Sequence, residues 1–374
     1  MKILQLIPTY KPAYVYGGPI FSVSKLCETL AAEGHEVRML TTTANGPDEL
    51  QVPTGKKVMV DGVEVYYYRR FTKDHTHLSP GLIWAVWRQC RRYDAVHIHA
   101  WWNIPVLMAV LVCWLRGVRP VLSPRGMLSD FSFGKSNPLS KRLIHKFGGA
   151  FLLRKVKMHL TAEAERQEVE RLGYPGGVVI PNIIDQATVP GSPLPRNHPP
   201  ELLFLSRIHP KKNLELLFQS LAEVPHDWRL NIAGDGEEAY ISALQKLAAE
   251  LGIAERINWL GHLSGEQKFD LYRKADLFVL TSHNENFANV VIEALSAGTP
   301  VLLTKGVGLS DYVRNNDLGW VCEANKDAVK SSLEEFFSRP ELARSFAANA
   351  RQTVERDFSA KALIPRYLEL YSQS

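Results

Sequence analysis

The sequence predicts an α/β protein made of two Rossmann-like, doubly wound domains that face a central cleft. Short, near-continuous apolar runs alternate with longer stretches of helical period along the 374 residues. This alternation is typical of parallel sheets covered by helices on both faces. A segment near the middle of the chain, 185–200, contains five prolines, and its apolar residues follow neither the helical nor the strand spacing. It therefore marks the boundary between two domains. In open sheets of this kind, ligands bind beyond the carboxyl ends of the strands.

The apolar runs define the expected strands. In the first half these are 2–8, 35–43, 63–69, 94–100, 120–124, 157–161 and 178–181, with helices expected at 19–33, 105–116 and 163–172. In the second half the expected strands are 201–206, 229–234, 257–260, 276–282, 300–304 and 320–322, with helices between them. We therefore expect an N-terminal domain at 1–184, a linker at 185–200 and a C-terminal domain from residue 201 onward.

The modest formal net charge of +5 conceals two halves of opposite sign. Residues 1–184 hold 24 lysines and arginines against 14 acidic residues, a net charge of +10, and the remaining residues hold 20 against 25. Much of the surplus lies in region 131–161, where basic residues alternate with bulky apolar ones. This mixture favours contact with an anionic membrane surface, although a solvated basic helix remains an alternative. We find no nucleic-acid-binding motif and expect no nucleic-acid partner.

The location expected from the sequence is cytoplasmic, with peripheral attachment to the inner face of the membrane. The four cysteines are widely spaced in apolar contexts, as reduced core thiols would be. The longest apolar run, 104–115, has 12 residues, short of the ~20 that span a bilayer. The first strand is too short to serve as the apolar region of a signal peptide.

The most informative motif runs from Glu285 to Glu293. A buried strand ends in a polar turn that carries Glu285, and a helix is expected to begin near Ala288. The free amides of its first turn form an anion site of the kind that holds phosphates. Ionised carboxylates are pure hydrogen-bond acceptors, so these two glutamates suit the hydroxyl groups of a sugar and a ribose.

Two further strand ends carry polar or flexible residues. Arg207 and Lys212 follow the strand at 201–206 and could converge on a diphosphate. At the N-terminus, Gly17 and Gly18 follow the first strand and precede a helix, where glycines allow a ligand to approach the backbone closely, although a plain turn remains an alternative.

His97 and His99 alternate on one strand and therefore point to the same face. His99 lies at the carboxyl end of the strand, where it is expected to hydrogen-bond a substrate, whereas His97 fits a core position. We predict no metal site and no cofactor, because no third ligand is nearby and the chain has no Asp-x-Asp, G-x-G-x-x-G or P-loop motif.

Together these residues resemble glycosyltransferase family 4, the retaining nucleotide-sugar transferases of the GT-B fold. The resemblance covers nearly the whole chain, and the Glu285-x7-Glu293 element is its most specific part. The form Glu-Asn-Phe-x-Asn-Val-Val-x-Glu-Ala-Leu is typical of members that build bacterial surface polysaccharides, and so is the segment Ser-Pro-Arg-Gly-Met at 123–127. Two departures from the family pattern are Ala288 and Asn213, where many members have glycine.

The resemblance implies a role for each candidate residue. Catalytic roles fall to His99, Arg207, Lys212 and Glu285, and the acceptor would meet Arg125 and Tyr16. Residues implied in donor binding are Gly17, Gly18, Arg207, Lys212, Glu285, Phe287, Ala288, Asn289, Val290 and Glu293. The donor domain is expected at 201–356, and the C-terminal helix, 357–374, is expected to cross back to the N-terminal, acceptor-binding domain.

The implied reaction moves a hexose or N-acetylhexosamine from a UDP-sugar, favoured over GDP-mannose, to a lipid-linked or saccharide acceptor without a metal ion. The pathway would be bacterial O-antigen, capsule or exopolysaccharide biosynthesis. Three alternatives stay open at this point: a non-hydrolysing sugar-nucleotide epimerase, a glycogen-type phosphorylase and a catalytically silent nucleotide-binding protein.

Overall fold

The computed structural model describes residues 1–129, 132, 145–187, 198–263 and 265–372. The chain forms two compact units. Unit 1 comprises Met1–Ile183 together with Ala360–Ser374, and unit 2 comprises Ile184–Ser359. The chain thus leaves unit 1 next to the boundary expected at residue 184 and returns to it at Ala360. Most of the predicted linker lies outside the described residues.

Unit 1 is built on an eight-stranded sheet in the order β10-β9-β8-β7-β1-β2-β6-β5. All neighbouring strands are parallel except β5 and β6. The order reverses between β1 and β7, so the loops that follow these two strands flank a topological switch point. The strands are β1 (Lys2–Leu6), β2 (Glu36–Thr42), β5 (Lys57–Val60), β6 (Val63–Tyr68), β7 (Ala95–His99), β8 (Val121–Ser123), β9 (Lys157–Leu160) and β10 (Val178–Val179), and a small separate hairpin is formed by β3 (Ala44–Asn45) and β4 (Asp48–Glu49).

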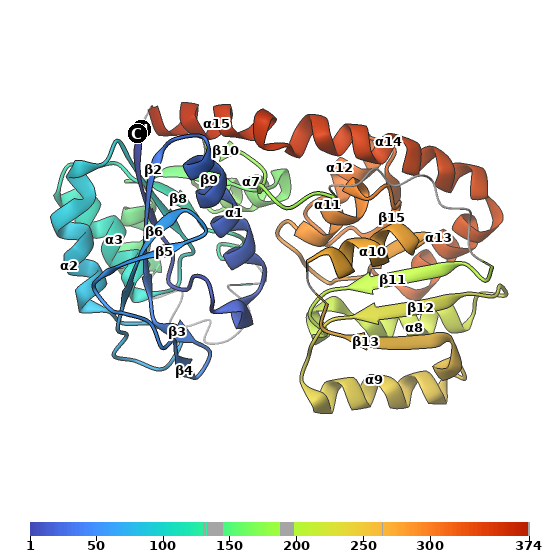
Figure 1. The fold of residues 1–374 in the computed structure, drawn as a ribbon. Coiled ribbons are helices and arrows are strands. Elements are labelled where there is room, and N and C mark those ends of the chain that lie inside the picture. The colour runs from blue at the N-terminus through green and yellow to red at the C-terminus, as the bar shows by residue number, and fades with distance from the viewer. Residues whose placement is uncertain (130–131, 133–144, 188–197, 264, 373–374) are drawn as a thin grey trace. The chain divides into compact units, whose positions relative to one another are not determined.

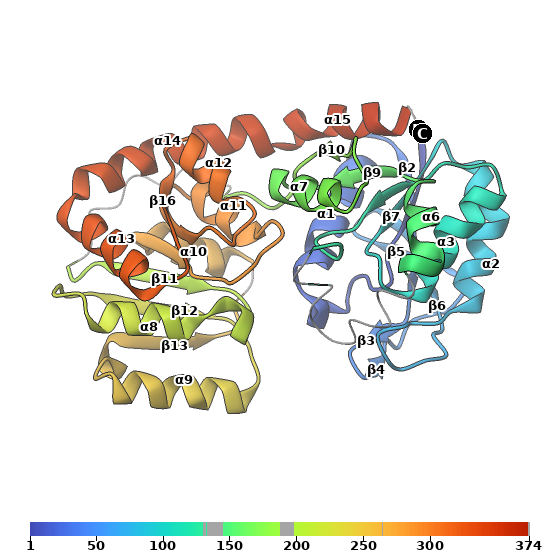
Figure 2. The ribbon, with the colours of Figure 1, turned by 180° about the vertical axis from the view of Figure 1, so that it is seen from behind.

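Helices cover both faces of this sheet, as Figures 1 and 2 show for α2 and α3 on one side and α1 on the other. One apolar core lies under α2 and α3 and includes Leu82, Val106 and Val110. The other lies under α1 and α15 and includes Val23, Leu26 and Leu363. The helices are α1 (Gly18–Ala32), α2 (Pro80–Gln89), α3 (Ile104–Leu115), α6 (Ala150–Leu153), α7 (Glu163–Arg171) and α15 (Ala360–Ser372).

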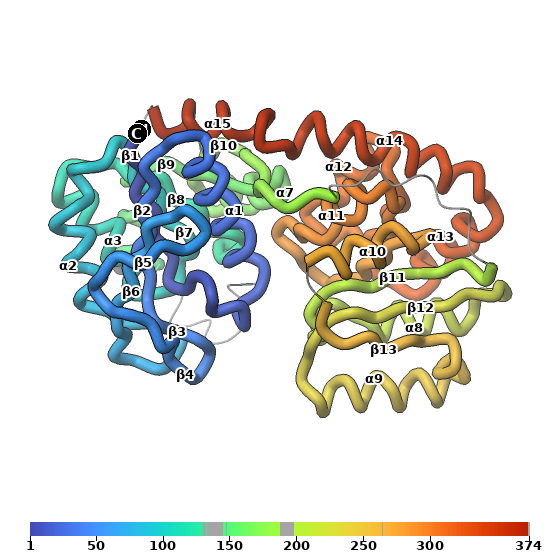
Figure 3. Tube along the Cα trace, viewed as in Figure 1, coloured from blue at the N-terminus to red at the C-terminus, as the bar shows by residue number. Residues whose placement is uncertain are grey.

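Unit 2 holds a six-stranded, fully parallel sheet in the order β13-β12-β11-β14-β15-β16, and Figure 3 shows β11, β12 and β13 side by side. Numbered within the unit, this is the order 3-2-1-4-5-6 of the dinucleotide-binding folds, with its switch point between β11 and β14. The strands are β11 (Glu201–Leu205), β12 (Arg229–Ala233), β13 (Ile257–Gly261), β14 (Leu277–Leu280), β15 (Val301–Thr304) and β16 (Gly319–Cys322).

The helices of unit 2 form two packed groups. Helix α8 packs against α9 and α13, and α11 packs against α10 and α14. Helix α14 ends at Phe358, and Ser359 is extended before α15 begins in unit 1. The helices are α8 (Leu214–Ala222), α9 (Glu238–Glu250), α10 (Glu266–Lys274), α11 (Asn289–Ser296), α12 (Ser310–Asn315), α13 (Lys326–Ser338) and α14 (Pro340–Phe358).

The predicted fold class is confirmed, with one correction to the expected sheets. Strand β5, an antiparallel edge strand paired with β6, is not among the expected strands. The two strands are joined by Asp61 and Gly62, both of which have positive φ angles of 48° and 82°. An Asp-Gly pair between apolar runs is a strong hairpin signal and would have identified this strand.

The four cysteines are buried and unpaired. Within the described part of the chain, no helix is both long and apolar enough to cross a bilayer.

Candidate active site

The switch point of unit 2 brings together two loops that the sequence analysis had singled out. One follows β11 and carries Arg207 and Lys212, and the other follows β14 and carries Glu285. Hydrogen bonds tie the loops to each other. The amide of His283 donates to the carbonyl of Lys211 at 3.0 Å, and the Thr281 hydroxyl donates to the carbonyl of Asn213 at 3.0 Å.

Lys212 and Glu285 form an ion pair across these loops. The Nζ atom of Lys212 lies 2.9 Å from Oε1 of Glu285, and both side chains are largely buried. The neighbouring Lys211 is farther away, with its Nζ 4.0 Å from the same oxygen. The Oε1 atom makes no well-formed hydrogen bond with any described residue, so its capacity as an acceptor is not used up. The structure therefore brings together a predicted diphosphate ligand and a predicted sugar ligand.

Glycines allow the strand-end loops to lie in direct backbone contact. A Cβ atom on Gly234 would lie 2.0 Å from the carbonyl oxygen of Ser206, and one on Gly236 would lie 2.3 Å from that of Ile208. On the other side of the switch point, a Cβ on Gly308 would lie 2.0 Å from the carbonyl oxygen of Asn286. No side chain fits at these positions, so the arrangement of the loops depends on glycine.

Helix α11 begins as the motif predicted. Its N-cap is Ala288, which adopts a left-handed conformation with φ of 67°, a region that glycine adopts more readily. Asn289 and Val290 follow as the first helical residues and are partly exposed. Phe287 was predicted to bind the donor, and its side chain is buried against Phe358, with 6.0 Å between the ring centroids. Only the backbone of Phe287 remains for a ligand.

Glu293 lies inside α11 and has two partners that the sequence analysis missed. The Nζ atom of Lys268 donates to Oε1 at 2.8 Å, and the hydroxyl of Tyr272 donates to Oε2 at 3.1 Å. Both partners lie on α10 and point at the carboxylate from a neighbouring helix. Their spacing of four residues on a helix preceding the motif was a possible signal, but it also fits an ordinary surface helix.

Arg207 differs from Lys212 in its surroundings. Its side chain is exposed and makes no hydrogen bond or ion pair with any residue that the structure describes. Arg207 stands directly beyond the end of β11, whereas Lys212 ends the short 3-10 turn η4 (Pro210–Lys212). The structure thus shows one predicted phosphate ligand held in place and the other free to move.

In unit 1, Gly17 and Gly18 lie between a short 3-10 turn, η1 (Tyr14–Tyr16), and the body of α1. Gly17 has a φ angle of 73°, and a Cβ on either glycine would meet no atom of the described residues within 4 Å. Among these residues, nothing fills the space beside this backbone. The hydroxyl of Tyr16 accepts a hydrogen bond from the amide of Gly46 at 3.0 Å, which ties the loop to the β3–β4 hairpin.

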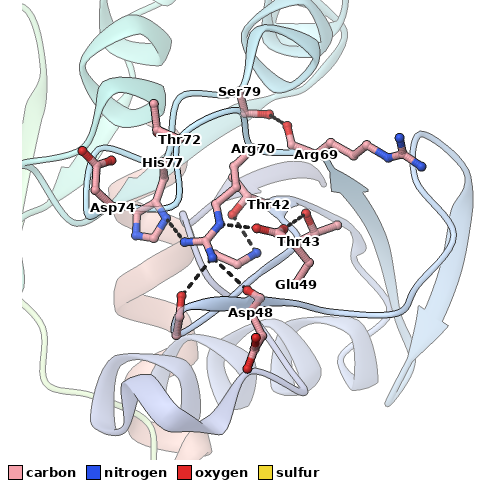
Figure 4. Close-up of polar contacts among 12 residues, drawn as sticks. Thr42, Thr43, Asp48, Glu49, Arg69, Arg70, Thr72, Asp74, His77 and Ser79 are labelled. Atoms are coloured by element: carbon pink, nitrogen blue, oxygen red, sulfur yellow. Dashed lines mark hydrogen bonds and ion pairs between the residues drawn. The ribbon is translucent and has the colours of Figure 1, made fainter.

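A buried arginine holds this hairpin, as Figure 4 shows. The side chain of Arg70 is 1% exposed and pairs with Glu49 of β4. Its Nη2 donates to the carbonyl oxygens of Gly46 and Asp48 at 2.9 and 2.8 Å, and its Nη1 lies 3.4 Å from Nδ1 of His77. Burial, followed by the charge of Arg70, lowers the pKa of His77 to about 4. Arg70 therefore fixes the hairpin that anchors Tyr16.

The structure changes the interpretation of His99. The residue is fully buried, its Nε2 lies 2.8 Å from Oε1 of Gln5, and its Nδ1 accepts from Nε of Arg125 at 3.2 Å. Because both ring nitrogens are bonded inside the protein, His99 has no atom free to contact a sugar in this conformation. Arg125 itself donates from Nη1 to Ser22 and Asn182, while its buried Nη2 has no partner among the described residues.

Known proteins support the interpretation of both units. Residues 17–182 match the model of the glycosyl transferase 4-like domain, and residues 185–353 match that of the glycosyl transferases group 1. The glycogen synthase of Mycobacterium tuberculosis is 27% identical over 99% of this chain and 94% of its own length. The lipopolysaccharide core biosynthesis glycosyltransferase LpsE of Rhizobium meliloti is 27% identical over 46% of this chain and 49% of its own.

A solved structure shows the same fold over both full chains. It is the Anabaena protein HepE in complex with UDP-glucose, with a TM-score of 0.74 and 19% sequence identity, covering 100% of each chain. The two family models together account for nearly all of the chain, and each matches one structural unit. The chain therefore belongs to the family 4-like glycosyltransferases of the GT-B fold.

Proposed function

We propose that the protein is a retaining glycosyltransferase that moves a hexose or N-acetylhexosamine from a nucleotide-diphosphate sugar, a UDP-sugar in preference to GDP-mannose, to a lipid-linked or saccharide acceptor. The pathway is bacterial polysaccharide biosynthesis, such as O-antigen, capsule or exopolysaccharide. The observation that carries the proposal is the Lys212–Glu285 pair at the switch point of unit 2. The relative in lipopolysaccharide core biosynthesis and the HepE complex with UDP-glucose support the pathway and the donor.

When the donor binds, its diphosphate would replace the carboxylate of Glu285 as the partner of Lys212. A diphosphate carries more charge than a carboxylate and is a stronger partner for the ammonium group. When the diphosphate becomes the partner of Lys212, the carboxylate of Glu285 can accept hydrogen bonds from the hydroxyl groups of the transferred sugar. Glu293, in the middle of α11, would accept hydrogen bonds from the ribose hydroxyls, and the first amides of this helix would assist at the phosphates.

The proposed chemistry uses the donor's own phosphate. The bond between the anomeric carbon and the phosphate oxygen breaks, and the acceptor hydroxyl forms its bond on the same face. That phosphate oxygen takes the hydroxyl proton, so the products are the glycoside and the nucleoside diphosphate. Lys212 and Arg207 stabilise the charge that develops on the leaving group. Because these two cations supply the neutralising charge, we propose that no metal ion is required.

The acceptor side of the proposal rests on unit 1. Arg125 offers a buried guanidinium with an unused Nη2, which suits an anionic or hydroxyl-rich acceptor. Tyr16, held at the β3–β4 hairpin, lies beside the open backbone of Gly17 and Gly18 and provides an aromatic surface for a sugar ring.

For peripheral attachment at the cytoplasmic face of the membrane, the described residues offer an aromatic–basic patch made of Trp114, Leu115, Phe151 and Lys155. The three apolar side chains are exposed, and the two rings meet edge to face at 5.0 Å. Lys155 Nζ lies 5.0 Å from the centroid of the Phe151 ring. Exposed aromatics beside a cation suit the interface of an anionic bilayer. Three further basic residues of the predicted region, Lys135, Lys141 and Arg142, lie outside the described residues.

Vesicle flotation tests the membrane proposal. The protein should float with vesicles containing phosphatidylglycerol and remain unbound with pure phosphatidylcholine. Trp114→Ala and Phe151→Ala should each weaken binding, whereas Phe71→Ala, which removes an exposed ring outside the patch, should not. Equal binding by all variants would exclude the patch as the contact surface.

A thermal-shift panel tests the donor proposal most directly. A bound ligand stabilises the folded state by RT ln(1 + [L]/Kd), so the correct nucleotide raises the melting temperature. We expect UDP and a UDP-sugar to act more strongly than GDP, ADP or their sugars. No shift with any nucleotide would contradict the proposal. Product analysis without acceptor separates a transferase from an epimerase, which would isomerise the donor, and intact donor in the presence of acceptor would indicate a silent binding protein.

A further inference from the structure

A buried glutamate, Glu165, joins helix α7 to the loop that carries Arg125. The residue is only 2% exposed. Its Oε1 accepts from the amide of Gly126 at 2.5 Å, and its Oε2 accepts from the amide and the hydroxyl of Thr161 at 2.8 and 3.0 Å. Because backbone N–H groups only donate, both side-chain oxygens must be acceptors. A carboxylate offers two such oxygens, whereas the amide of a glutamine offers one.

The bond to Thr161 is that of a helix cap. Glu165 is the third residue of α7, and a glutamate or glutamine at this position commonly reaches back to an amide at the start of its helix. One oxygen is enough for that role. The bond from Gly126 to the other oxygen lies outside the helix, so capping does not explain it.

Arg125 and Gly126 form the middle of a left-handed turn. The amide of Met127 donates to the carbonyl of Pro124 at 3.1 Å, and the two residues between them have φ angles of 53° and 77°. Positive φ angles at both central positions are typical of a type I′ turn. Glycine adopts this conformation readily, whereas arginine is strained in it. The mirror-image type I turn has the same closing hydrogen bond and would relieve the strain at Arg125.

The peptide between Arg125 and Gly126 distinguishes the two turns. In the mirror image this peptide is turned over, so the N–H of Gly126 points to the opposite face of the turn. In the observed turn it points at Oε1 of Glu165. A hydrogen bond to a buried charged group is stronger than one between neutral groups, so this bond stabilises the left-handed turn over its mirror image. The bond that closes the turn is common to both forms and favours neither.

The turn sets the direction in which the Arg125 side chain leaves the backbone. From this position its guanidinium group donates to His99, Ser22 and Asn182, and among the described residues no carboxylate contacts it. Burial lowers the pKa of Arg125, and Glu165 is among the nearby groups whose charge opposes this lowering. Because the Glu165 oxygens are bonded elsewhere, this counter-charge leaves the buried Nη2 without a partner in the described part of the chain.

We propose that Glu165 is a positioning residue of the acceptor site: it stabilises the left-handed turn at Arg125 and Gly126, and so places the guanidinium group with its Nη2 unoccupied. The consequence for acceptor binding rests on the proposed function, in which Arg125 meets the acceptor. The stabilisation of the turn does not, and it is measured on the protein without substrate.

Glu165→Gln is the test variant, and Glu163→Gln is its matched control. Both substitutions remove a carboxylate from the first turn of α7, but Glu163 is exposed and pairs with Arg166 on the same helix. Glutamine can keep the helix cap with its one oxygen, so Glu165→Gln should fold. It cannot also accept from Gly126, because its remaining group is an NH₂.

Selective labelling reports on the turn with two signals. The chain contains two Arg–Gly pairs, 116–117 and 125–126, so arginine labelled with ¹³C at the carbonyl and glycine labelled with ¹⁵N together select two amides. The amide of Gly117 donates to the carbonyl of Trp114 at 3.0 Å and serves as the internal control. In the parent protein, the Gly126 proton should resonate downfield and exchange slowly with solvent, because it is donated to a buried carboxylate.

The Nε–H of Arg125, assigned by its loss in Arg125→Lys, reports on the guanidinium group itself. In Glu165→Gln the Gly126 proton should move upfield. It should exchange about tenfold faster or more, together with the Nε–H of Arg125, because a hydrogen bond to a charged group is lost. The Gly117 signal should not change. Glu163→Gln should leave all three signals as they are in the parent protein.

Parent-like signals in folded Glu165→Gln would overturn the proposal, and so would an equal change in Glu163→Gln. A change at Gly126 that leaves the Arg125 signal unaffected would also overturn it, because the turn would then not place the guanidinium group. If Glu165→Gln does not fold, the parent protein decides: slow exchange of a downfield Gly126 proton supports the carboxylate bond, and exchange as fast as that of an exposed amide overturns it.

The outcome is independent of the donor panel. The expected changes at Gly126 and Arg125 in a protein that binds no nucleotide would support the role of Glu165 in the turn and contradict the proposed transferase. Nucleotide binding together with parent-like signals in Glu165→Gln would do the reverse.

Discussion

The Nζ atom of Lys212 lies 2.9 Å from Oε1 of Glu285, across the two loops that flank the switch point of unit 2. Each side chain neutralises the other while both are largely buried. The pair keeps the cation in the position that a diphosphate would need, without an isolated buried charge. This relationship makes distinct predictions for the two residues.

Replacing Lys212 should affect turnover far more than replacing its neighbour. If Lys212 stabilises the leaving diphosphate, Lys212→Ala should lower the rate by about two orders of magnitude or more. Lys211 is the matched control, because its Nζ lies 4.0 Å from the same carboxylate oxygen. Lys211→Ala should retain most of the activity. The assay measures release of nucleoside diphosphate from the donor that the thermal-shift panel identifies, and near-normal turnover by Lys212→Ala would rule out its role.

Replacing Glu285 should separate binding of the nucleotide from binding of the sugar. Glu285→Gln removes a negative charge beside the proposed diphosphate site and leaves Lys212 unpaired, so UDP alone should bind at least as tightly as to the parent protein. The amide is a weaker acceptor for sugar hydroxyls, so any additional affinity for the UDP-sugar should be lost. Titration calorimetry with UDP and with the UDP-sugar measures both. Weaker binding of UDP itself would contradict the exchange of partners at Lys212.

Gly234→Ala should destabilise the loops of unit 2 by more than the conformational cost of placing alanine at a positive φ angle. The new Cβ would lie 2.0 Å from the carbonyl oxygen of Ser206, and backbone on both sides would have to move. Gly252→Ala is the control, because Gly252 also has a positive φ but open space around it, so only a conformational cost of about 1–3 kcal/mol is expected. Thermal melting and the UDP-induced shift compare the two. If Gly234→Ala and Gly252→Ala lowered the melting temperature and the UDP-induced shift equally, the close backbone contact at Gly234 would not be needed for stability or UDP binding.

How far the sequence could predict the site differs from residue to residue. Lys212 and Glu285 were predictable because each lies in the loop that follows a buried strand, and parallel strand ends meet at one edge of a sheet. Lys268 and Tyr272 were not, because only tertiary packing turns one face of α10 toward Glu293. The alternation of His97 and His99 predicted their shared face correctly, but nothing local indicated that β9 and α15 would enclose them.

Acid should destabilise unit 1 through its buried neutral histidines. Burial lowers the pKa of His77 to about 4 and of His159 to about 3, and it holds those of His97 and His99 well below the usual range. The unfolded chain takes up protons near pH 6.5 and the folded chain does not, so this stability is complete above pH 6.5 and is lost as the pH falls toward the folded-state values. Each such histidine should lower the free energy of unfolding by about 1 kcal/mol between pH 7.5 and 5.5.

Thermal melting at pH 7.5, 6.5 and 5.5 tests this effect. The melting temperature of unit 1 should fall as the pH is lowered. His159→Gln should make this fall shallower, because one proton fewer is taken up on unfolding. A melting temperature that does not change over this range would show that the unfolded state takes up no more protons than the folded one.

Variants of the Lys268–Glu293 ion pair should affect stability and nucleotide binding differently. Lys268→Met removes the cation and leaves Glu293, only 8% exposed, with the Tyr272 hydroxyl as its remaining partner. Loss of a hydrogen bond to a buried charged group should lower stability by about 1.5–3 kcal/mol. Lys246→Met is the surface control, because among the described residues Lys246 forms an ion pair only with Glu250 on the exposed face of α9. Adding Glu293→Gln to Lys268→Met should restore much of the stability, because it removes the uncompensated charge. It should not restore the UDP-induced shift if Glu293 holds the ribose, and recovery of both together would remove Glu293 from the donor site.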